Sequence, residues 1–415
     1  MNIVIQKEID DRKELLQDAA AVFSKGYVDM ITAEGIDLIE EGGRGTRLYD
    51  MSGLEYLDCD TSGAIYNLGR GRRELGDALR EAARQTDQGN FIAISEEKAL
   101  LAEKLSSFIP GRLECFLFTV VRGEAMDAAC KLARGYTKRA EIITVDGGWY
   151  GHTGFSLCMS AREDKHLFGP GIPGIKEIPF GDIDAAKKTV NSKTAAVVLE
   201  TVQAENGCRH TAGEYYSELR KLCSRSGAVL IVDESQTGFG RTGERFSFER
   251  FGFEPDIAVL GEAITGGMFP MTAMAFTRKL KSFFDDHPLI HLCTFGGHDV
   301  GCRVAVKALE LYESERSWEN AQSMGDMLHS ELCRIARDNI EMIGGVRGIG
   351  LLQSITLKDE EITRRFCVEA RKAGLICMRG RVDRRSVVFR PSLAVTREDV
   401  QQIVECVKIS LDNVA

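Results

Sequence analysis

Short apolar runs alternate with amphipathic stretches through most of the chain. The apolar runs have six to eight residues and include AEIITV (140–145), AAVVLE (195–200), GAVLIVDE (227–234) and PDIAVLG (255–261). Apolar runs of this length without polar alternation are typical of strands that are buried on both faces. The stretches between them carry apolar residues at three-and-four spacing, as helices with one buried face do. The pattern therefore predicts an α/β fold with a mostly parallel sheet covered by helices on both sides.

The pattern changes near residue 300. Before it, amphipathic helices are predicted at 72–86 and 96–109, and the strand CFLFTVV (115–121) leads directly into a helix over 123–137. After it, a long helix over 300–315 precedes shorter helices and the apolar segments GGVRGIGLLQSITL and SVVFRPSL. These features indicate a smaller α+β domain, which we expect to include the N-terminal segment as well. We predict domain boundaries of 1–60 and 301–415 for the two parts of the small domain, and 61–300 for the large domain.

Charge and cysteine usage narrow the class of protein. The 415 residues include 53 basic and 62 acidic side chains, a net charge of −9, which disfavours nucleic acid or an anionic membrane as the partner. No run approaches the roughly 20 apolar residues of a membrane-spanning helix. The start of the sequence lacks the apolar core of a secretory signal, and the twelve cysteines form no CxxC pair. We therefore expect reduced thiols and a cytoplasmic location.

No metal site is predicted. The only spaced histidine pair is His287 and His291, in HPLIH, which has a proline between its members and no acidic ligands arranged around it.

Polar residues follow three of the predicted strands. Asp233 ends a strongly apolar strand, and Gln236 lies three residues further on. The strand at 115–121 turns into a helix whose free N–H groups favour an anion. Glu262 precedes a glycine turn. A capping role would explain Asp233 alone, but three polar strand ends in one sheet predict a shared pocket, because ligands of α/β sheets gather at the carboxyl ends of the strands.

Several of these segments resemble the class III aminotransferases, and within them the ornithine and acetylornithine aminotransferase branch. The resemblance rests on DESQTGFGRTG, FGFEPDIAVLGEAITGGMFPMTAMAFT and CTFGGHD, and extends to RLYDMSGLEYLDCDTSGAIYNLG, EAMDAACKLARGYT, VLETVQAENG, VRGIGLL and FRPSL. It implies fold type I: a large domain that binds pyridoxal 5′-phosphate (PLP) on a mostly parallel seven-stranded sheet, and a smaller α+β domain from both termini. It also implies a homodimer with active sites at the subunit interface.

Four cofactor positions of the family are retained. Asp233 falls where the family has the carboxylate that pairs with the pyridine nitrogen and keeps it protonated. Gln236 matches the residue near the ring hydroxyl, and Trp149 matches the aromatic side chain that stacks on the ring. Thr294 matches the threonine that the neighbouring subunit offers to the phosphate.

Other positions depart from the family. Glu262 falls where the family has the lysine that forms the Schiff base, and a carboxylate moves protons but forms no imine. Val121 and Arg122 replace a Ser-Gly pair before the phosphate-binding helix, and Gly123 follows them. Tyr150 replaces a histidine after the stacking residue. Arg122, Gly123 and Tyr150 stay candidates for contact with a cofactor.

The position that holds the substrate carboxylate differs as well. Val388 falls where an arginine commonly does this in the family, with Arg390 two residues further on as a substitute.

Three interpretations follow. The first is a diverged enzyme that binds PLP, pyridoxamine 5′-phosphate (PMP) or another anionic small molecule without a covalent link. Glu262 would then be its acid–base group and face an amine, while Arg122 would meet the phosphate and both would lie near Trp149. The second is a catalytically inactive subunit that serves as a scaffold or as the partner of an active paralogue. The third is an ordinary transaminase of amino acids or amines that uses another lysine, for which Lys279 and Lys281 are the nearby candidates.

Overall fold

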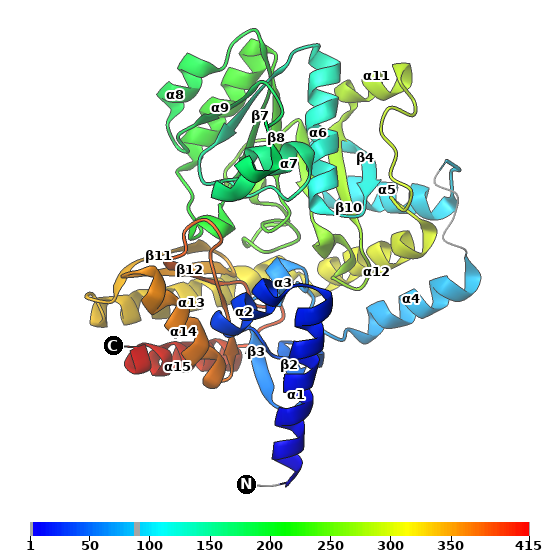
Figure 1. Cartoon of the computed structure of the whole chain (residues 1–415). Helices are drawn as coiled ribbons and strands as arrows, with labels where there is room; N and C mark the ends of the chain where they lie inside the picture. The colour runs from blue at the N-terminus through cyan, green and yellow to red at the C-terminus, as the bar shows by residue number, and fades with distance from the viewer. Residues whose placement is uncertain (1–2, 87–91, 415) are drawn as a thin grey trace.

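A seven-stranded sheet forms the centre of the larger part of the molecule. The computed structural model describes residues 3–86 and 92–414, and Figure 1 shows the sheet between layers of helices. All neighbouring strands pair in parallel except that β10 is antiparallel to both β4 and β9. The strand order is β4 (Leu113–Thr119), β10 (Thr272–Thr277), β9 (Ile257–Leu260), β8 (Val229–Asp233), β7 (Thr194–Glu200), β5 (Glu141–Val145) and β6 (Ile175–Ile178). The predicted fold class is confirmed.

Each central strand buries side chains on both faces. In β8, Leu230 and Val232 belong to one apolar cluster, which includes residues of α5, α9 and α12, while Val229 and Ile231 belong to another, which includes residues of α6 and α11. This period-two division explains why the strands read as continuous apolar runs, since neither face meets water.

Two smaller four-stranded sheets lie beside the large one. The first has the order β1 (Glu40–Arg44), β2 (Arg47–Asp50), β3 (Glu55–Asp58) and β13 (Leu375–Ile376), and the second β11 (Ile343–Ile349), β12 (Leu352–Leu357), β15 (Ser386–Phe389) and β14 (Met378–Arg379). Because β13 pairs in parallel with β3, segments from the two ends of the chain share one sheet. The domain boundaries at residues 60 and 300 stay predictions.

The helices account for the amphipathic stretches. The segments expected at 72–86, 96–109, 123–137 and 300–315 are found as α4, α5, α6 and α12. The α-helices are α1 (Ile3–Val22), α2 (Lys25–Ala33), α3 (Thr61–Ala64), α4 (Arg73–Gln85), α5 (Glu96–Phe108), α6 (Arg122–Thr137), α7 (Gly154–Met159), α8 (Ile183–Thr189), α9 (Gly213–Ser226), α10 (Ser247–Arg250), α11 (Arg278–Asp286), α12 (Asp299–Glu315), α13 (Ser317–Asp338), α14 (Glu360–Lys372) and α15 (Arg397–Val414). Three short 3₁₀ turns are η1 (Glu163–Phe168), η2 (Ala204–Asn206) and η3 (Glu262–Thr265). Across the described ranges, no helix is both long and apolar enough to cross a bilayer.

Candidate active site

Six strands of the large sheet point their carboxyl ends at one edge, and five of them carry the polar residues of the candidate site. These five are β4, β5, β7, β8 and β9, which run in the same direction because each is parallel to its neighbours or separated from them by the reversed strand β10. Polar residues at or just after these ends come together in one cluster. They are Arg122, Trp149, Glu200, Asp233 and Glu262.

The Arg122 guanidinium is the centre of this cluster. Its Nε donates to Asp233 Oδ2 at 2.9 Å, and its Nη2 lies 2.8 Å from the same oxygen and 3.0 Å from Glu200 Oε1. Nη2 also donates to the backbone carbonyl of Trp149. The Arg122 side chain is 13% exposed, whereas Asp233 has no exposed side-chain surface. One largely buried cation therefore serves two buried carboxyl groups.

Burial controls the protonation of these groups. Burial lowers the pKa of Arg122, but Asp233 and Glu200 raise it by more, so the guanidinium stays charged. Burial raises the pKa of Glu200 to about 8; Arg122 opposes this rise, and the negative charge of Asp233 adds to it. Burial thus outweighs the attraction of the cation that lies 3.0 Å away, and the pKa of Glu200 is raised overall.

Glu262 approaches the same place from β9. Gly261 follows the strand in an extended conformation, and Glu262 begins η3. Its Oε1 accepts the backbone N–H of Arg122 at 3.3 Å, at the N-terminus of α6. A carboxylate is favoured there by the helix dipole. Glu262 is partly exposed and, among the described residues, forms no ion pair within 4.0 Å.

Trp149 is buried beside the cluster, and its ring contacts two cations. The guanidinium carbons of Arg162 and Arg381 lie 5.6 Å and 5.4 Å from the ring centroid, within the range of cation–π contacts. Glu200 Oε2 accepts the Trp149 backbone N–H at 2.8 Å. Tyr150 is completely buried, and its hydroxyl lies 3.2 Å from the Oγ1 atom of a threonine in β5, so it faces the sheet.

Gln236 belongs to a second buried network. Its Oε1 accepts from Arg390 Nη1 at 2.6 Å, and its Nε2 donates to Glu205 Oε1 at 3.2 Å. Arg390 also contacts Glu205 at 2.8 Å and Asp60 at 2.7 Å. The Arg390 guanidinium is thus paired with carboxylates of this chain. Val388, the position that the resemblance compares with an arginine, is buried in an apolar cluster with Val202 and other aliphatic side chains.

The remaining candidate residues lie as follows. Gly123, in the first turn of α6, leaves no room for a side chain, since a Cβ there would be 2.7 Å from Thr153 Oγ1. Thr294 is exposed, between α11 and α12, and its role across a subunit interface stays a prediction. Lys279 and Lys281 lie on α11, where their amines contact the ring of a tyrosine and the carboxylate of an aspartate.

One predicted arrangement differs from what the structure shows. Arg122 and Glu262 do meet near Trp149, but the guanidinium is directed at Asp233 and Glu200 instead of an open phosphate site. The physical reason is the carboxyl group of Glu200, which was not predicted as a site residue. It ends the apolar run AAVVLE, so the same strand-end rule that selects Asp233 also selects Glu200.

Other contributors carry no local signal. Glu205 lies in the short turn η2, and Asp60, Arg162 and Arg381 come from loops. Only the folded chain brings these four residues to Gln236, Arg390 or Trp149.

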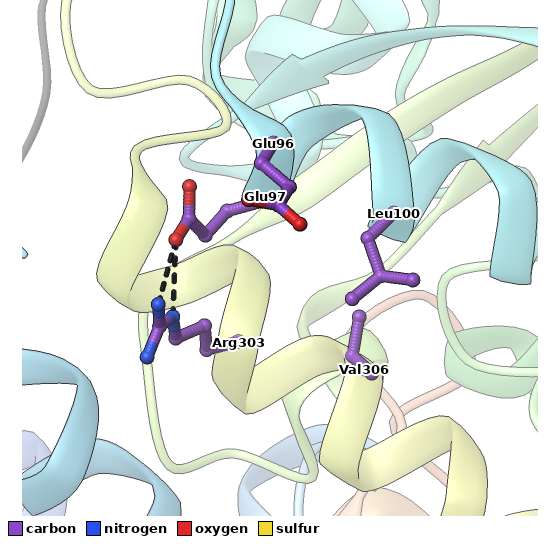
Figure 2. Close-up of a pocket in the computed structure, with 5 residues that line it drawn as sticks. All are labelled: Glu96, Glu97, Leu100, Arg303 and Val306. Atoms are coloured by element: carbon purple, nitrogen blue, oxygen red, sulfur yellow. Dashed lines mark hydrogen bonds and ion pairs between the residues drawn. The ribbon is translucent and has the colours of Figure 1, made fainter.

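Two surface hollows lie outside this cluster. One, of about 280 Å³, lies between α5 and α12 and is lined by Glu96, Glu97, Leu100, Arg303 and Val306; Figure 2 shows the Arg303–Glu97 ion pair within it. The other, of about 320 Å³, opens beside the end of η3 and includes Tyr66, Arg70 and Met268. Neither hollow includes a residue of the Arg122 cluster. Across the described residues, no group of three or more His, Cys, Asp and Glu side chains is placed to hold a metal ion.

Comparison with known families gives a consistent result over nearly the whole chain. The model of the family described as aminotransferase class-III matches residues 32–411. An uncharacterized aminotransferase of Archaeoglobus fulgidus is 36% identical over 371 residues, which cover 89% of this chain and 87% of that protein.

Solved structures agree with this match. An (S)-enantioselective omega-transaminase from Thermomicrobium roseum superposes with a TM-score of 0.89 at 27% identity, covering 97% of this chain and 98% of that one. The ornithine aminotransferase from Toxoplasma gondii, whose active site is described with partial occupancy of PLP, superposes with a TM-score of 0.86 at 25% identity. The coverage there is 91% of this chain and 90% of that one.

Proposed function

From the premise that this chain belongs to the class III aminotransferase family, we propose that it is a diverged, transferase-like enzyme that works without an internal aldimine. Class III aminotransferases are PLP-dependent, and the relatives of this chain support transferase chemistry on its scaffold. We propose in addition that Glu262 is the acid–base group of this site and that it contacts the amine of a ligand.

The observation that carries the proposal is the position of Glu262. It follows β9, where the resemblance places the lysine, and it lies within 3.3 Å of the first N–H of α6. A carboxylate at this point accepts and returns a proton but offers no amine to a carbonyl. The two lysines nearest in sequence, Lys279 and Lys281, lie on α11 with partners there, which supports the interpretation that no other lysine takes over.

The side chains in the pocket do not fit PLP bound in the manner of the family. Asp233 Oδ2 receives Arg122, and Asp233 Oδ1 accepts the backbone N–H of Ser235 at 2.9 Å, so both oxygens are engaged. Non-covalent PLP or PMP would have to displace Arg122. The proposed chemistry therefore does not pass through this cofactor.

The Glu262 carboxylate would attract a protonated amine and repel an anion. Glu262 has no ion-pair partner among the described residues, while Arg122 already serves two carboxyl groups. The matched structures include enzymes named for ornithine and for omega-transamination, and ornithine carries amines. We propose that an amine-bearing small molecule places its ammonium group against Glu262, which exchanges a proton with it. Assembly as a homodimer and a cytoplasmic location belong to the same proposal.

Thermal shift with ornithine, N-acetylornithine and lysine tests this assignment. One or more of these amines should stabilise the wild-type protein in a saturable manner, and Glu262→Gln should weaken that binding about tenfold or more, since a charge-assisted contact is lost. Glu310→Gln is the matched control, because Glu310 lies on α12 and pairs with Lys307 instead of the Arg122 cluster. Equal binding by wild type and Glu262→Gln would refute the role of Glu262.

A second candidate function is a non-catalytic subunit. The observation in its favour is the Arg122–Asp233–Glu200 cluster, because these charged groups already pair with one another. Absence of a saturable shift with any amine, together with stable association with an active paralogue, would favour this function over the enzyme.

A further inference from the structure

Three side chains that the resemblance assigns to the cofactor ring are each engaged by an arginine of this chain. Arg122 contacts Asp233, Arg390 contacts Gln236, and Arg162 and Arg381 lie over Trp149. The three contacts come from different parts of the sequence, so they are independent observations. Together they show that the residues expected to contact a cofactor ring are instead in contact with arginines of this chain.

We infer that Arg122 acts as a built-in counter-ion that replaces a bound pyridinium cation, so that the protein is complete without a vitamin B6 cofactor and excludes it. The guanidinium stands where a ligand cation would neutralise Asp233, and only 13% of its side chain is exposed. This inference is separate from the proposed role of Glu262, because Glu262 contacts the backbone N–H of Arg122 whereas the Arg122 guanidinium contacts Asp233 and Glu200.

The charges explain why Asp233 does not pair with Arg122 and with a protonated pyridine ring at the same time. Asp233 Oδ2 already has guanidinium nitrogens at 2.9 Å and 2.8 Å, and its other oxygen accepts a backbone N–H. A protonated ring nitrogen brought to this carboxylate would meet a like charge at short range in a place shielded from water, where such repulsion is strong. Moving Arg122 aside would also leave Glu200 Oε1 without its guanidinium hydrogen-bond donor.

The phosphate end meets a similar obstacle. The N-terminus of α6, which would attract a phosphate, already has the Glu262 carboxylate at the Arg122 N–H. A dianionic phosphate would therefore meet the negative charge of Glu262 at this helix end.

The chain contains its own reporter for the test. Its only tryptophans are Trp149, in the site, and Trp318, which lies near Phe108 and Arg245. In a Trp318→Phe background, the emission of Trp149 reports on the pocket alone. PMP is the probe, because it lacks the aldehyde that reacts with surface lysines and so measures non-covalent binding.

Three proteins are titrated with PMP: the Trp318→Phe parent, the same protein with Arg122→Ser, and a matched control with Arg73→Ser, whose side chain is 90% exposed on α4. We expect no saturable change of Trp149 emission up to about 1 mM PMP in the parent and the control, and at least about tenfold tighter binding after Arg122→Ser. Circular dichroism and sedimentation establish that each variant is folded. If Arg122→Ser does not fold, Arg122→Gln takes its place, because Gln leaves Asp233 a neutral hydrogen-bond donor.

Two results would overturn the inference. One is saturable PMP binding by the parent with an affinity similar to that of the Arg122 variant. The other is a folded Arg122 variant that binds PMP no better than the parent, which would mean that Arg122 is not what excludes the cofactor. Neither result bears on the amine-binding test of Glu262, so the two proposals fail separately.

Discussion

At the scale of single residues, the carboxyl groups of Glu200 and Asp233 share one guanidinium inside the protein. Arg122 supplies it, and both acids are almost completely inaccessible to water. Removing one partner of a buried ion pair lowers the stability of the fold much more than replacing both partners by apolar residues, because the remaining charge keeps its desolvation penalty. The cluster is therefore sensitive to changes in Arg122 and to pH together.

Arg122→Met should destabilise the protein strongly at alkaline pH and less at acidic pH. Without the cation, the native-state pKa of Glu200 rises further above its unfolded value, because Arg122 no longer opposes the effect of burial. A carboxyl group with a raised native pKa stabilises the fold while it is protonated, and this stability is lost as pH rises through the native pKa. Since the pKa of Glu200 is already raised to about 8, the loss should develop between about pH 5 and pH 8 or above.

Urea unfolding at about pH 5.5 and pH 8.5 measures this effect. We expect a loss of about 3–5 kcal/mol in unfolding free energy at the higher pH and a clearly smaller loss at the lower one. Arg73→Met, at an exposed position, is the matched control and should change little. A loss that does not depend on pH would contradict the role given to the buried carboxyl groups.

Glu262→Lys alone should not restore transamination. The new amine would lie next to the Arg122 backbone, but Arg122 would still occupy Asp233, and Val388 would still stand at the position that the resemblance compares with the carboxylate-binding arginine. Misplacement of a reacting group by about 1 Å costs on the order of a hundredfold in rate. Assays with PLP and ornithine, N-acetylornithine or lysine should show negligible amino transfer by Glu262→Lys. Robust turnover by this single variant would show that residue 262 was the only barrier.

At the scale of elements, the turn between β9 and η3 fixes the distance from Glu262 to the cluster. A glycine is needed at position 261 because the ends of β8 and β9 lie close together there. Its backbone dihedral angles are not the reason, since a φ of −84° suits any residue. A Cβ at this position would lie 2.5 Å from the carbonyl oxygen of Ser235, which follows β8. The absence of a side chain thus lets the ends of β8 and β9 approach each other.

Gly261→Ala should therefore force these strand ends apart. We expect a destabilisation of about 1–3 kcal/mol, typical of overpacking, together with weaker amine binding at Glu262. Gly345→Ala in β11 is the control, since a Cβ there meets nothing within 4 Å. Thermal unfolding and the amine thermal shift are the two readouts. A Gly261→Ala protein as stable as the control would contradict the close contact of these strands.

The elements also show what the sequence makes predictable. Strands buried on both faces, such as β7 and β8, are read directly from apolar runs. β6 was not predicted, because only Ile178 of its four residues is buried and its pattern is that of an edge strand. β10 lies in the segment used for the resemblance and carries no signal for its reversed direction, which depends on its neighbours.

The site was predictable in part for the same reason. Asp233 ends a strand, Arg122 and Glu262 follow strands, and parallel strands bring their carboxyl ends together. The partner of Arg122 was not predictable, because a long flexible side chain at a helix start has several directions open to it. The folded chain selects Asp233 and Glu200, two buried carboxyl groups at neighbouring strand ends.

At the scale of the whole molecule, exposed apolar side chains gather in two segments that contact each other. Ile94 is 93% exposed and Phe295 is 54% exposed, and the hydroxyl of Ser95 donates to Asp299 Oδ1 at 2.5 Å, which joins the two segments. Further exposed apolar side chains in the second segment are Leu289, Ile290 and Leu292. Exposed apolar side chains on neighbouring segments favour a contact with another chain.

We predict that the protein is a homodimer and that this surface contributes to the interface. Sedimentation velocity should show a dimer for the wild type and a shift toward monomer for Ile94→Asp combined with Phe295→Asp. Ile340→Asp, at a 76% exposed position after α13, is the control and should remain dimeric. A wild-type monomer at working concentration would argue against the interface and against the predicted role of Thr294.

The central claim for the whole molecule is that a member of a PLP-dependent family works without a lysine-bound cofactor. The most direct measurement is borohydride reduction of the protein incubated with PLP, followed by peptide mapping. We predict no stoichiometric pyridoxyl-lysine in any peptide, because residue 262 carries a carboxylate and Lys279 and Lys281 lie on α11. Recovery of one stoichiometric adduct on a single lysine would contradict this claim.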